Sequence, residues 1–149
     1  MLEHKLDQDI KSAMLAKDVH RTTTLRGLKS NLLDAKVAGN KREVGLTDDE
    51  VIAIFAKEAK KRQETADIYL SAGDQARADQ ELSEKAMIEE YLPKPISEKE
   101  ISRVIDEVIA KLEVNSLSQM GQVIGQVKQK LGPAADGSLI AKLTKEKLE

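Results

Sequence analysis

The stretch YLPKPISEKE, residues 91–100, divides the chain into two parts. Neither Pro93 nor Pro95 can donate a backbone hydrogen bond, and each biases the residue before it toward an extended conformation. Directly after them, Ser97 is followed three residues later by Glu100, which is the pattern of a capping box at the start of a helix. The stretch therefore predicts a helix that ends near residue 91, a proline hinge, and a new helix just past Ser97.

Past the hinge, apolar residues recur every three or four positions in three short segments, which is the spacing of one buried helix face. The first segment runs from Ile101 to Leu112. The second runs from about Ser118, its expected N-cap, to Leu131, and the third follows the turn Asp136-Gly137-Ser138. These patterns predict a small three-helix C-terminal domain over residues 97–149, which has little room for a core.

Upstream of the hinge, the same spacing predicts four longer helices in an N-terminal domain of residues 1–92. A capping box from Thr47 to Glu50 starts the third of them, and Phe55 and Tyr69 fall on its expected buried stripe. No segment alternates with period two, so the predicted fold class is all-α. The expected helices cover about residues 2–16, 19–38, 48–72 and 74–91.

Composition excludes several kinds of site. The 149 residues are 40% hydrophobic, 34% charged and only 2% aromatic, which favours helix over sheet. Cysteine is absent, so there are no disulfides, thiolate metal ligands or cysteine nucleophiles. No apolar run reaches the roughly 20 residues that span a bilayer, and the first residues lack the apolar core of a secretion signal. We therefore expect a soluble, cytoplasmic protein without a membrane partner.

The charge balance is close to neutral in both predicted domains. The chain carries a net charge of −2; residues 1–96 hold 16 basic and 18 acidic residues, and residues 97–149 hold 8 of each. Neither part has the strong positive balance of an autonomous nucleic-acid-binding domain. DNA is therefore not an expected partner, and only local patches are candidates for binding RNA.

No constellation of residues indicates catalysis. The two histidines, His4 and His20, have no spaced His or Cys partner for a metal or nucleophile site. Carboxylates fall on helix caps and polar faces rather than in the paired, contrasting environments that acid–base chemistry needs. No loop of the GxxxxGK[ST] type is present to hold a phosphate. We expect no catalytic residue, no metal and no cofactor.

Two basic stripes at helical spacing are candidates for neutralising phosphates on an RNA backbone. Acidic residues such as Asp34, Glu58 and Glu64 are interleaved with them, so an ordinary solvated helix face is the alternative. Little aromatic character accompanies either stripe, which argues against reading of single strands by base stacking. The first stripe is Arg26, Lys29 and Lys36, and the second is Lys57, Lys60, Lys61 and Arg62.

A third candidate lies in the helix expected near residues 118–131. Gly121 and Gly125 are four residues apart and share one helix face, although each costs a helix interior about 1 kcal/mol relative to alanine. A face of nearly bare backbone favours close approach, either of a neighbouring helix inside the domain or of a partner molecule. Lys128 belongs to the same helix, and with Gln122 and Gln126 it excludes a membrane dimerisation motif.

Five short segments spread along the chain form a recognisable combination. They are Thr24-Leu25-Arg26, Lys60-Lys61-Arg62-Gln63-Glu64, Ala72-Gly73, Tyr91-Leu92-Pro93 followed by Ser97, and the series Met120-Gly121, Gly125, Gly132 and Asp136-Gly137. Together they resemble the YqeY family, and the resemblance covers essentially the whole chain. Two positions depart from the family pattern: Asp74 and Pro133 each stand where family members often carry a basic residue, so both changes remove positive charge.

The resemblance implies a fold shared with the tail of GatB, the B subunit of the tRNA-dependent amidotransferase. In that enzyme the tail helps to hold tRNA while another part of the subunit performs the amide chemistry, and a related region is appended to some glutaminyl-tRNA synthetases. The resemblance therefore implies an accessory module that binds tRNA or a tRNA-handling protein. The family label, carbon–nitrogen ligase with glutamine as amido donor, belongs to the larger enzyme.

Three functional hypotheses follow. The leading one is a non-catalytic helical module that binds tRNA or a tRNA-handling protein. The second is a protein–protein adaptor without RNA binding, which the near-neutral C-terminal part favours. The third is an amidotransferase-type enzyme in its own right, which lacks a visible nucleophile system, metal site or ATP loop. The sequence leaves the oligomeric state open.

Overall fold

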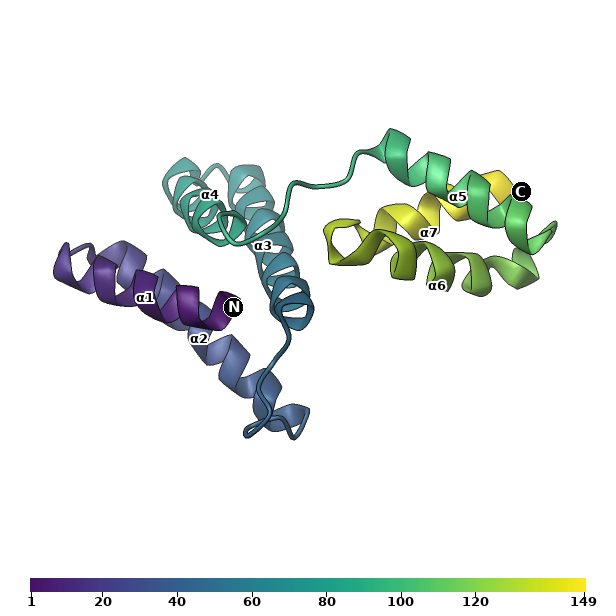
Figure 1. Cartoon of the computed structure of the whole chain (residues 1–149). Coiled ribbons are helices and arrows are strands. Elements are labelled where there is room, and N and C mark those ends of the chain that lie inside the picture. The colour runs from purple at the N-terminus through teal and green to yellow at the C-terminus, as the bar shows by residue number, and fades with distance from the viewer. The chain divides into compact units, whose positions relative to one another are not determined.

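The computed structural model describes residues 1–149 and is helical throughout (Figure 1). It contains no strand, so the predicted all-α class is confirmed. The chain forms two compact units, Met1–Leu92 and Pro93–Glu149. None of its helices has both the length and the apolar character that crossing a membrane requires. The elements are α1 (Leu2–Leu15), α2 (Val19–Ala38), α3 (Asp48–Ser71), α4 (Gln75–Glu89), α5 (Glu98–Leu112), η1 (Leu117–Gln119), α6 (Met120–Leu131), η2 (Gly132–Ala134) and α7 (Gly137–Leu148).

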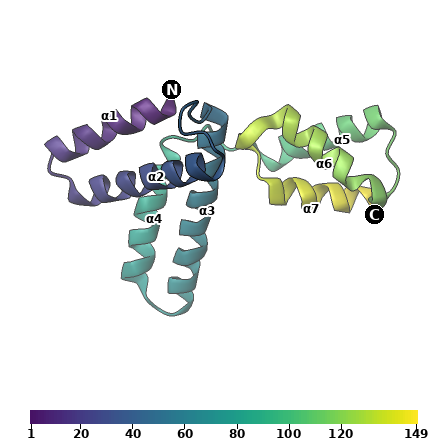
Figure 2. The ribbon, with the colours of Figure 1, turned by 90° about the horizontal axis from the view of Figure 1, so that it is seen from below.

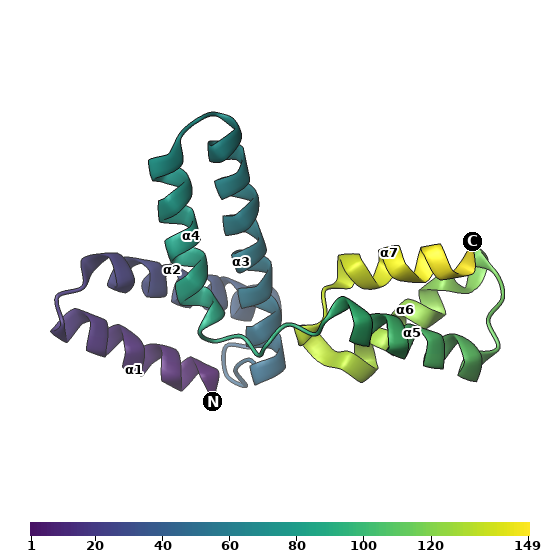
Figure 3. The same cartoon turned by 90° about the horizontal axis from the view of Figure 1, so that it is seen from above.

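In the N-terminal unit, α1 and α2 lie side by side across the base of a hairpin formed by α3 and α4 (Figures 2 and 3). The predicted burial of Phe55 is confirmed, because its side chain is 0% exposed and its ring meets the ring of Tyr91 edge-on, with 5.6 Å between centroids. Apolar side chains from all four helices close around this pair and form one core at the base of the hairpin. The other core residues are Leu6, Ile10, Leu25, Leu28, Leu32, Val51, Ala59 and Ile88.

The far half of the hairpin projects beyond α1 and α2 (Figure 3). The buried apolar residues there are Ala66 and Ala78, both 0% exposed, which let the two helices approach closely. Tyr69, expected in the core, is only half-buried, and Arg77 lies over its ring at 5.8 Å. That prediction was wrong because only α4 packs against α3 at this end of the hairpin, and no third helix covers the side of α3 that carries Tyr69.

Short polar side chains fix the helix starts of this unit. Thr47 and Glu50 form the complete capping box that the sequence predicts. The side chain of Asp18 accepts a hydrogen bond from the backbone N–H of Arg21, and Asp74 accepts one from Arg77. The acidic residue that departs from the family pattern at position 74 therefore has a structural role as the N-cap of α4.

In the C-terminal unit, α5, α6 and α7 pack around a single core (Figure 1). Ser97 caps α5 by accepting from the backbone N–H of Glu100, but the Glu100 carboxylate bonds to Arg103, so only half of the predicted capping box is present. Ser118, the expected N-cap of α6, lies inside η1, and α6 begins without a side-chain cap. The core is made of Ile101, Val104, Ile105, Val108, Val114, Val123, Val127, Ile140 and Leu143.

Candidate functional site

The first basic stripe, on α2, is largely occupied by contacts with α1. The ammonium of Lys29 lies 2.6 Å from a carboxylate oxygen of Asp7, and that of Lys36 lies 2.6 Å from Glu3. The guanidinium of Arg26 donates to the sulfur of Met14. These side chains hold α1 against α2, and the two lysines present little unbalanced positive charge to a partner.

The hollow between α1 and α2 that these pairs border has a volume of about 60 Å³. Sites for small molecules measure roughly 300–1,000 Å³, so this hollow is too small for a substrate or cofactor of ordinary size. Its lining residues are Glu3, Leu6, Asp7, Lys29, Leu32, Leu33 and Lys36.

The second basic stripe, on α3, contains one residue with an internal role. The Arg62 guanidinium reaches carboxylate oxygens of Glu84 at 2.7 Å, Glu81 at 3.3 Å and Glu58 at 3.8 Å. The first two belong to α4, so Arg62 joins the two helices of the hairpin. Lys57, Lys60 and Lys61 are exposed, and the Lys61 ammonium lies 3.8 Å from Glu58.

The glycines of α6 do not pack against a neighbouring helix. Gly121 and Gly125 are exposed, and a Cβ atom added at either position would meet no atom within 4 Å. The interpretation that they allow close packing inside the domain is therefore wrong, because α6 buries its opposite side through Val123 and Val127, both 0% exposed. The close approach in this unit is instead at Gly137, where a Cβ would lie 3.2 Å from the Cε atom of Lys128.

The solvent side of α6, here called the outer face of α6, carries glycines, glutamine amides and lysines but no carboxylate. No Asp or Glu occurs anywhere in residues 114–135, although 26 of the 149 residues are acidic. This surface was missed by the sequence analysis, which looked for clusters of basic residues and not for a segment without acidic residues. The outer face consists of Gly121, Gln122, Gly125, Gln126, Lys128, Gln129 and Lys130, all exposed.

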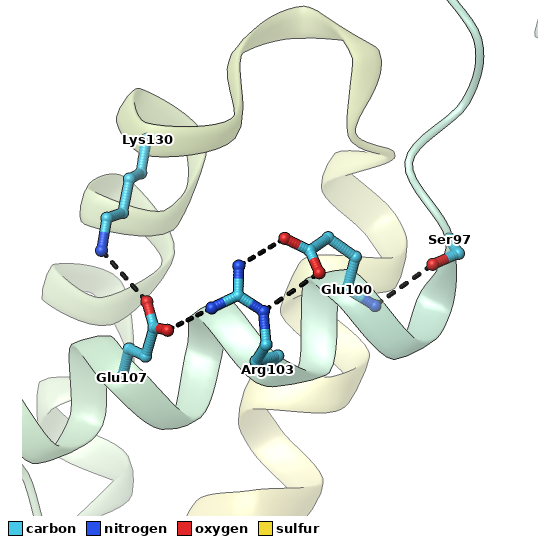
Figure 4. Close-up of polar contacts among 5 residues, drawn as sticks. All are labelled: Ser97, Glu100, Arg103, Glu107 and Lys130. Atoms are coloured by element: carbon cyan, nitrogen blue, oxygen red, sulfur yellow. Dashed lines mark hydrogen bonds and ion pairs between the residues drawn. The ribbon is translucent and has the colours of Figure 1, made fainter.

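The acidic residues of the C-terminal unit lie on or beside α5 and α7, and most of those on α5 are paired. Arg103 lies between Glu100 and Glu107, and Lys130 reaches across from α6 to Glu107 at 3.2 Å (Figure 4). A hydrogen bond from Arg103 lowers the pKa of the Glu100 carboxyl, and the same contact raises the pKa of Arg103. On the other side of α5, Lys147 pairs with Asp106 at 2.8 Å. Lys128 forms none of these ion pairs.

A partly buried polar contact just past the end of α4 was missed by the sequence analysis. The Tyr91 hydroxyl donates to a carboxylate oxygen of Asp9 on α1, and the Lys5 ammonium lies 4.2 Å above the tyrosine ring. Beside it, Arg21 pairs with Glu90 at 2.9 Å. Tyr91 and Asp9 are 82 residues apart in sequence. The sequence therefore indicated only that a tyrosine precedes the hinge prolines, and it did not identify the partner of that tyrosine.

The pKa shifts of Tyr91 and Asp9 indicate a structural role for this contact. Burial and the bond to Asp9 raise the pKa of the Tyr91 hydroxyl. Burial alone favours the neutral form of Asp9, but the hydrogen bond from Tyr91 and the nearby Lys5 outweigh it and hold the pKa of that carboxyl below its usual 3.8. A phenol that ionises less readily than free tyrosine is poorly suited to proton transfer near neutral pH. The pair joins α1 to the segment that leaves α4.

No group of three or more His, Cys, Asp or Glu side chains is arranged to hold a metal ion. Two exposed surfaces remain as candidates for contact with a partner. One is formed by Lys57, Lys60 and Lys61 on α3, and the other is the outer face of α6. They lie in different units of the chain.

Comparison with known proteins gives the chain a family and a functional context. The family model described as "Yqey-like protein" matches residues 3–148. A Kluyveromyces lactis protein named altered inheritance of mitochondria protein 41, mitochondrial, is 28% identical over 131 residues, which are 86% of this chain and 70% of that protein. Its namesake from Lachancea thermotolerans is 27% identical over 132 residues, covering 87% of this chain and 70% of that protein.

A further relative belongs to a tRNA-dependent enzyme. It is the E subunit of the glutamyl-tRNA(Gln) amidotransferase of Thermococcus gammatolerans, which is 28% identical over 134 residues. The match covers 82% of this chain but only 20% of that relative. The matched part of this chain therefore corresponds to a fifth of a much longer relative.

Proposed function

Because this chain belongs to the YqeY-like family, we propose that it is an accessory helical module that binds tRNA or a protein that handles tRNA, without a catalytic centre of its own. The observation that carries the proposal is the match of 82% of the chain to 20% of an amidotransferase component named for its tRNA. The resemblance described above implies that such a segment helps to hold tRNA while another part of the enzyme performs the chemistry.

The geometry supports binding of a partner rather than catalysis. The Tyr91–Asp9 contact is an interhelical tie, and the hollow between α1 and α2, at about 60 Å³, is below the size of a small-molecule site. Exposed lysines on α3 and the carboxylate-free face of α6 are compatible with a polyanion.

Titration of the purified chain with labelled tRNA tests the proposal. We expect the observed association constant to fall steeply as salt rises from about 50 to 200 mM, because neutralising phosphates releases counterions. A DNA duplex of matched length is the control and should bind more weakly, since DNA is not part of the proposal. Absence of tRNA binding even at the lowest salt would reject direct RNA recognition.

The second candidate is a protein–protein adaptor, which the near-neutral C-terminal part, with 8 basic and 8 acidic residues, favours over RNA binding. Under this alternative, Gly125→Leu abolishes capture of a protein partner from cell extract while the circular dichroism spectrum remains helical. The exposed position of Gly125 makes the substitution compatible with folding. Loss of helical signal in the variant would remove this line of support for the adaptor.

A carbon–nitrogen ligase activity with glutamine as amido donor is the third alternative. We expect no glutamine-dependent release of ammonia from the pure chain, and a measured release would overturn the non-catalytic proposal. We also propose a cytoplasmic location, in contrast to the two relatives whose names include "mitochondrial". Imaging of a fluorescent fusion in the native cell tests the location. DNA and membranes are not part of the proposed set of partners.

A further inference from the structure

We propose that the outer face of α6 contacts the sugar–phosphate backbone of RNA, without reading its bases. This inference rests on the proposed function and assigns it a surface. The basic stripe on α2, the most evident candidate in the sequence, has its two lysines within 2.6 Å of carboxylates. The outer face of α6 has fewer cations, but it carries no carboxylate that would neutralise them.

The first step is the sign of the local charge. The acidic residues of the C-terminal unit lie on α5, at its C-terminal end, at the N-cap of α7, and near the end of α7, while residues 114–135 contain none. Lys128 forms no ion pair, and Lys130 shares Glu107 with Arg103. A phosphate approaching α6 therefore meets positive charge and no carboxylate on the helix itself, which lowers the electrostatic cost of its approach.

The second step is the supply of hydrogen-bond donors. The side chains of Gln122, Gln126 and Gln129 are exposed and extend from the same side of the helix. Glutamine amides and lysine ammonium groups are among the donors that contact phosphate and ribose oxygens in protein–nucleic acid complexes. The helix has no aromatic residue on which a base can stack, so contact with the backbone is favoured over reading of bases.

The third step is the shape of the surface. On a helical projection, Gly125 and Gln129 lie near the middle of the outer face, with Lys128 toward α7 and Lys130 toward α5. A Cβ atom at Gly125 would meet no atom within 4 Å, so the glycine is not required by packing in its own unit. Gly121 and Gly125 leave a low strip beside Lys128, bordered on its other side by the glutamine side chains, where a curved polyanion can approach the helix backbone. The glycines support the proposal, but the distribution of charge and donors carries it.

The test adds negative charge to the face without altering its shape. We prepare the full chain with Gln122→Glu and Gln126→Glu together, and as a matched control the chain with Gln8→Glu and Gln80→Glu, which are exposed positions on α1 and α4. Both variants carry the same net charge. We expect the α6 variant to lose about tenfold in tRNA affinity at low salt, and the control to lose much less.

A second pair of variants separates packing from binding. Gly125→Ala and Gly27→Ala both place a methyl group in open space on an exposed helix face. Both should raise the unfolding midpoint in urea, because alanine favours helix over glycine. Only Gly125→Ala should weaken tRNA binding, by severalfold, and this combination of higher stability with lower affinity is not produced by a purely structural role.

The outcomes are distinguishable. If wild-type chain binds tRNA and both glutamate variants lose affinity equally, or neither loses any, α6 is not the contact surface, although the proposed function stands. If wild-type chain does not bind tRNA at any salt, both proposals fail. If the α6 variant retains tRNA affinity but loses a captured protein, the surface belongs to a protein partner and the RNA assignment is overturned.

Discussion

In the N-terminal unit, Lys29 and Arg62 each have a carboxylate within 2.7 Å, whereas in the C-terminal unit Lys128 reaches none. The N-terminal unit contains the longer runs of basic residues, so it is the more evident candidate for binding a polyanion. Several of its cations instead join helices to each other, as Arg62 joins α3 to α4. The number of cations in a segment is therefore a poor guide to its free charge, and the carboxylates that the fold brings near them decide what remains for a partner.

The largest effect that sharpens this comparison is expected at Arg62. Arg62→Ala should lower the free energy of unfolding by about 2 kcal/mol, because Glu81 and Glu84 lose a charged hydrogen-bond donor while remaining mostly shielded from solvent. Urea titration followed by circular dichroism measures the change. Lys57→Ala, on an exposed site of the same helix, is the control and should stay within about 0.5 kcal/mol. Equal behaviour of the two variants would show that Arg62 is an ordinary surface cation.

A smaller loss is expected for Tyr91→Phe, which removes the hydrogen bond to Asp9 and should cost about 1.5 kcal/mol near neutral pH. The pKa of Tyr91 is raised in the folded chain, so its contribution is complete below the unfolded value of 10.0 and decreases as pH rises above it. The pKa of Asp9 is lowered, so its contribution is present above 3.8 and decreases as pH falls below it.

The stability difference between wild type and Tyr91→Phe should therefore be widest between about pH 5 and 9 and should narrow at both extremes. Urea titrations at a series of pH values measure it. A difference that stays constant down to pH 3 would contradict the assignment of the Asp9 carboxylate as the acceptor.

The next largest effect is an increase in stability. Gly125→Ala should raise the free energy of unfolding by up to about 1 kcal/mol, because the added methyl group meets nothing and alanine favours helix. Gly132→Ala, at the end of the same helix, should lower it, because Gly132 has a φ of 73° that side chains rarely adopt. Thermal unfolding of the two variants measures the contrast. A loss of stability in Gly125→Ala would contradict the open position of this glycine and would show that it is required for packing.

The smallest effect on stability is expected for Lys128→Gln and Lys29→Gln, both within about 0.5 kcal/mol. Lys128 is an exposed side chain without an ion pair, and the exposed ion pair of Lys29 with Asp7 contributes little. Their tRNA binding should differ. Lys128→Gln should reduce the slope of log affinity against log salt by about 1, as expected for one lost phosphate contact. Lys29→Gln should leave the slope unchanged, since Lys29 is held by Asp7. If only Lys29→Gln reduced the slope, the phosphate contact would lie in the N-terminal unit and not on α6.

Helix positions were predictable because their signals are local. Thr47 with Glu50 starts α3 and Ser97 starts α5, each within a few residues of the boundary that it sets. The α6 N-cap was not predictable in this way, because η1 shifts the helix start past Ser118. That Pro93 and Pro95 act as a hinge stays a prediction.

The candidate site was less predictable because its electrostatics depend on residues far apart in sequence. Lys36 and Glu3 are separated by 33 positions, and Arg62 and Glu84 by 22. Helical spacing places each cation on a face but does not identify the facing helix. The exposure of Gly125 has the same origin, since the spacing of Val123 and Val127 fixes the buried side of α6 but does not show whether a second helix covers the other side.

The alanine contacts in the far half of the α3–α4 hairpin have a consequence for motion. Ala66 and Ala78 bury little apolar area. The polar links between the two helices are the ion pairs of Arg62 with Glu81 and Glu84 and the hydrogen bond from Lys85 to Gln63, all on the side of these alanines nearer the base. Opening this end exposes much less apolar surface than unfolding the core around Phe55. Backbone amides near Ala66 and Ala78 should therefore exchange with deuterium sooner than those near Phe55, through separation of the hairpin tip while the base stays folded.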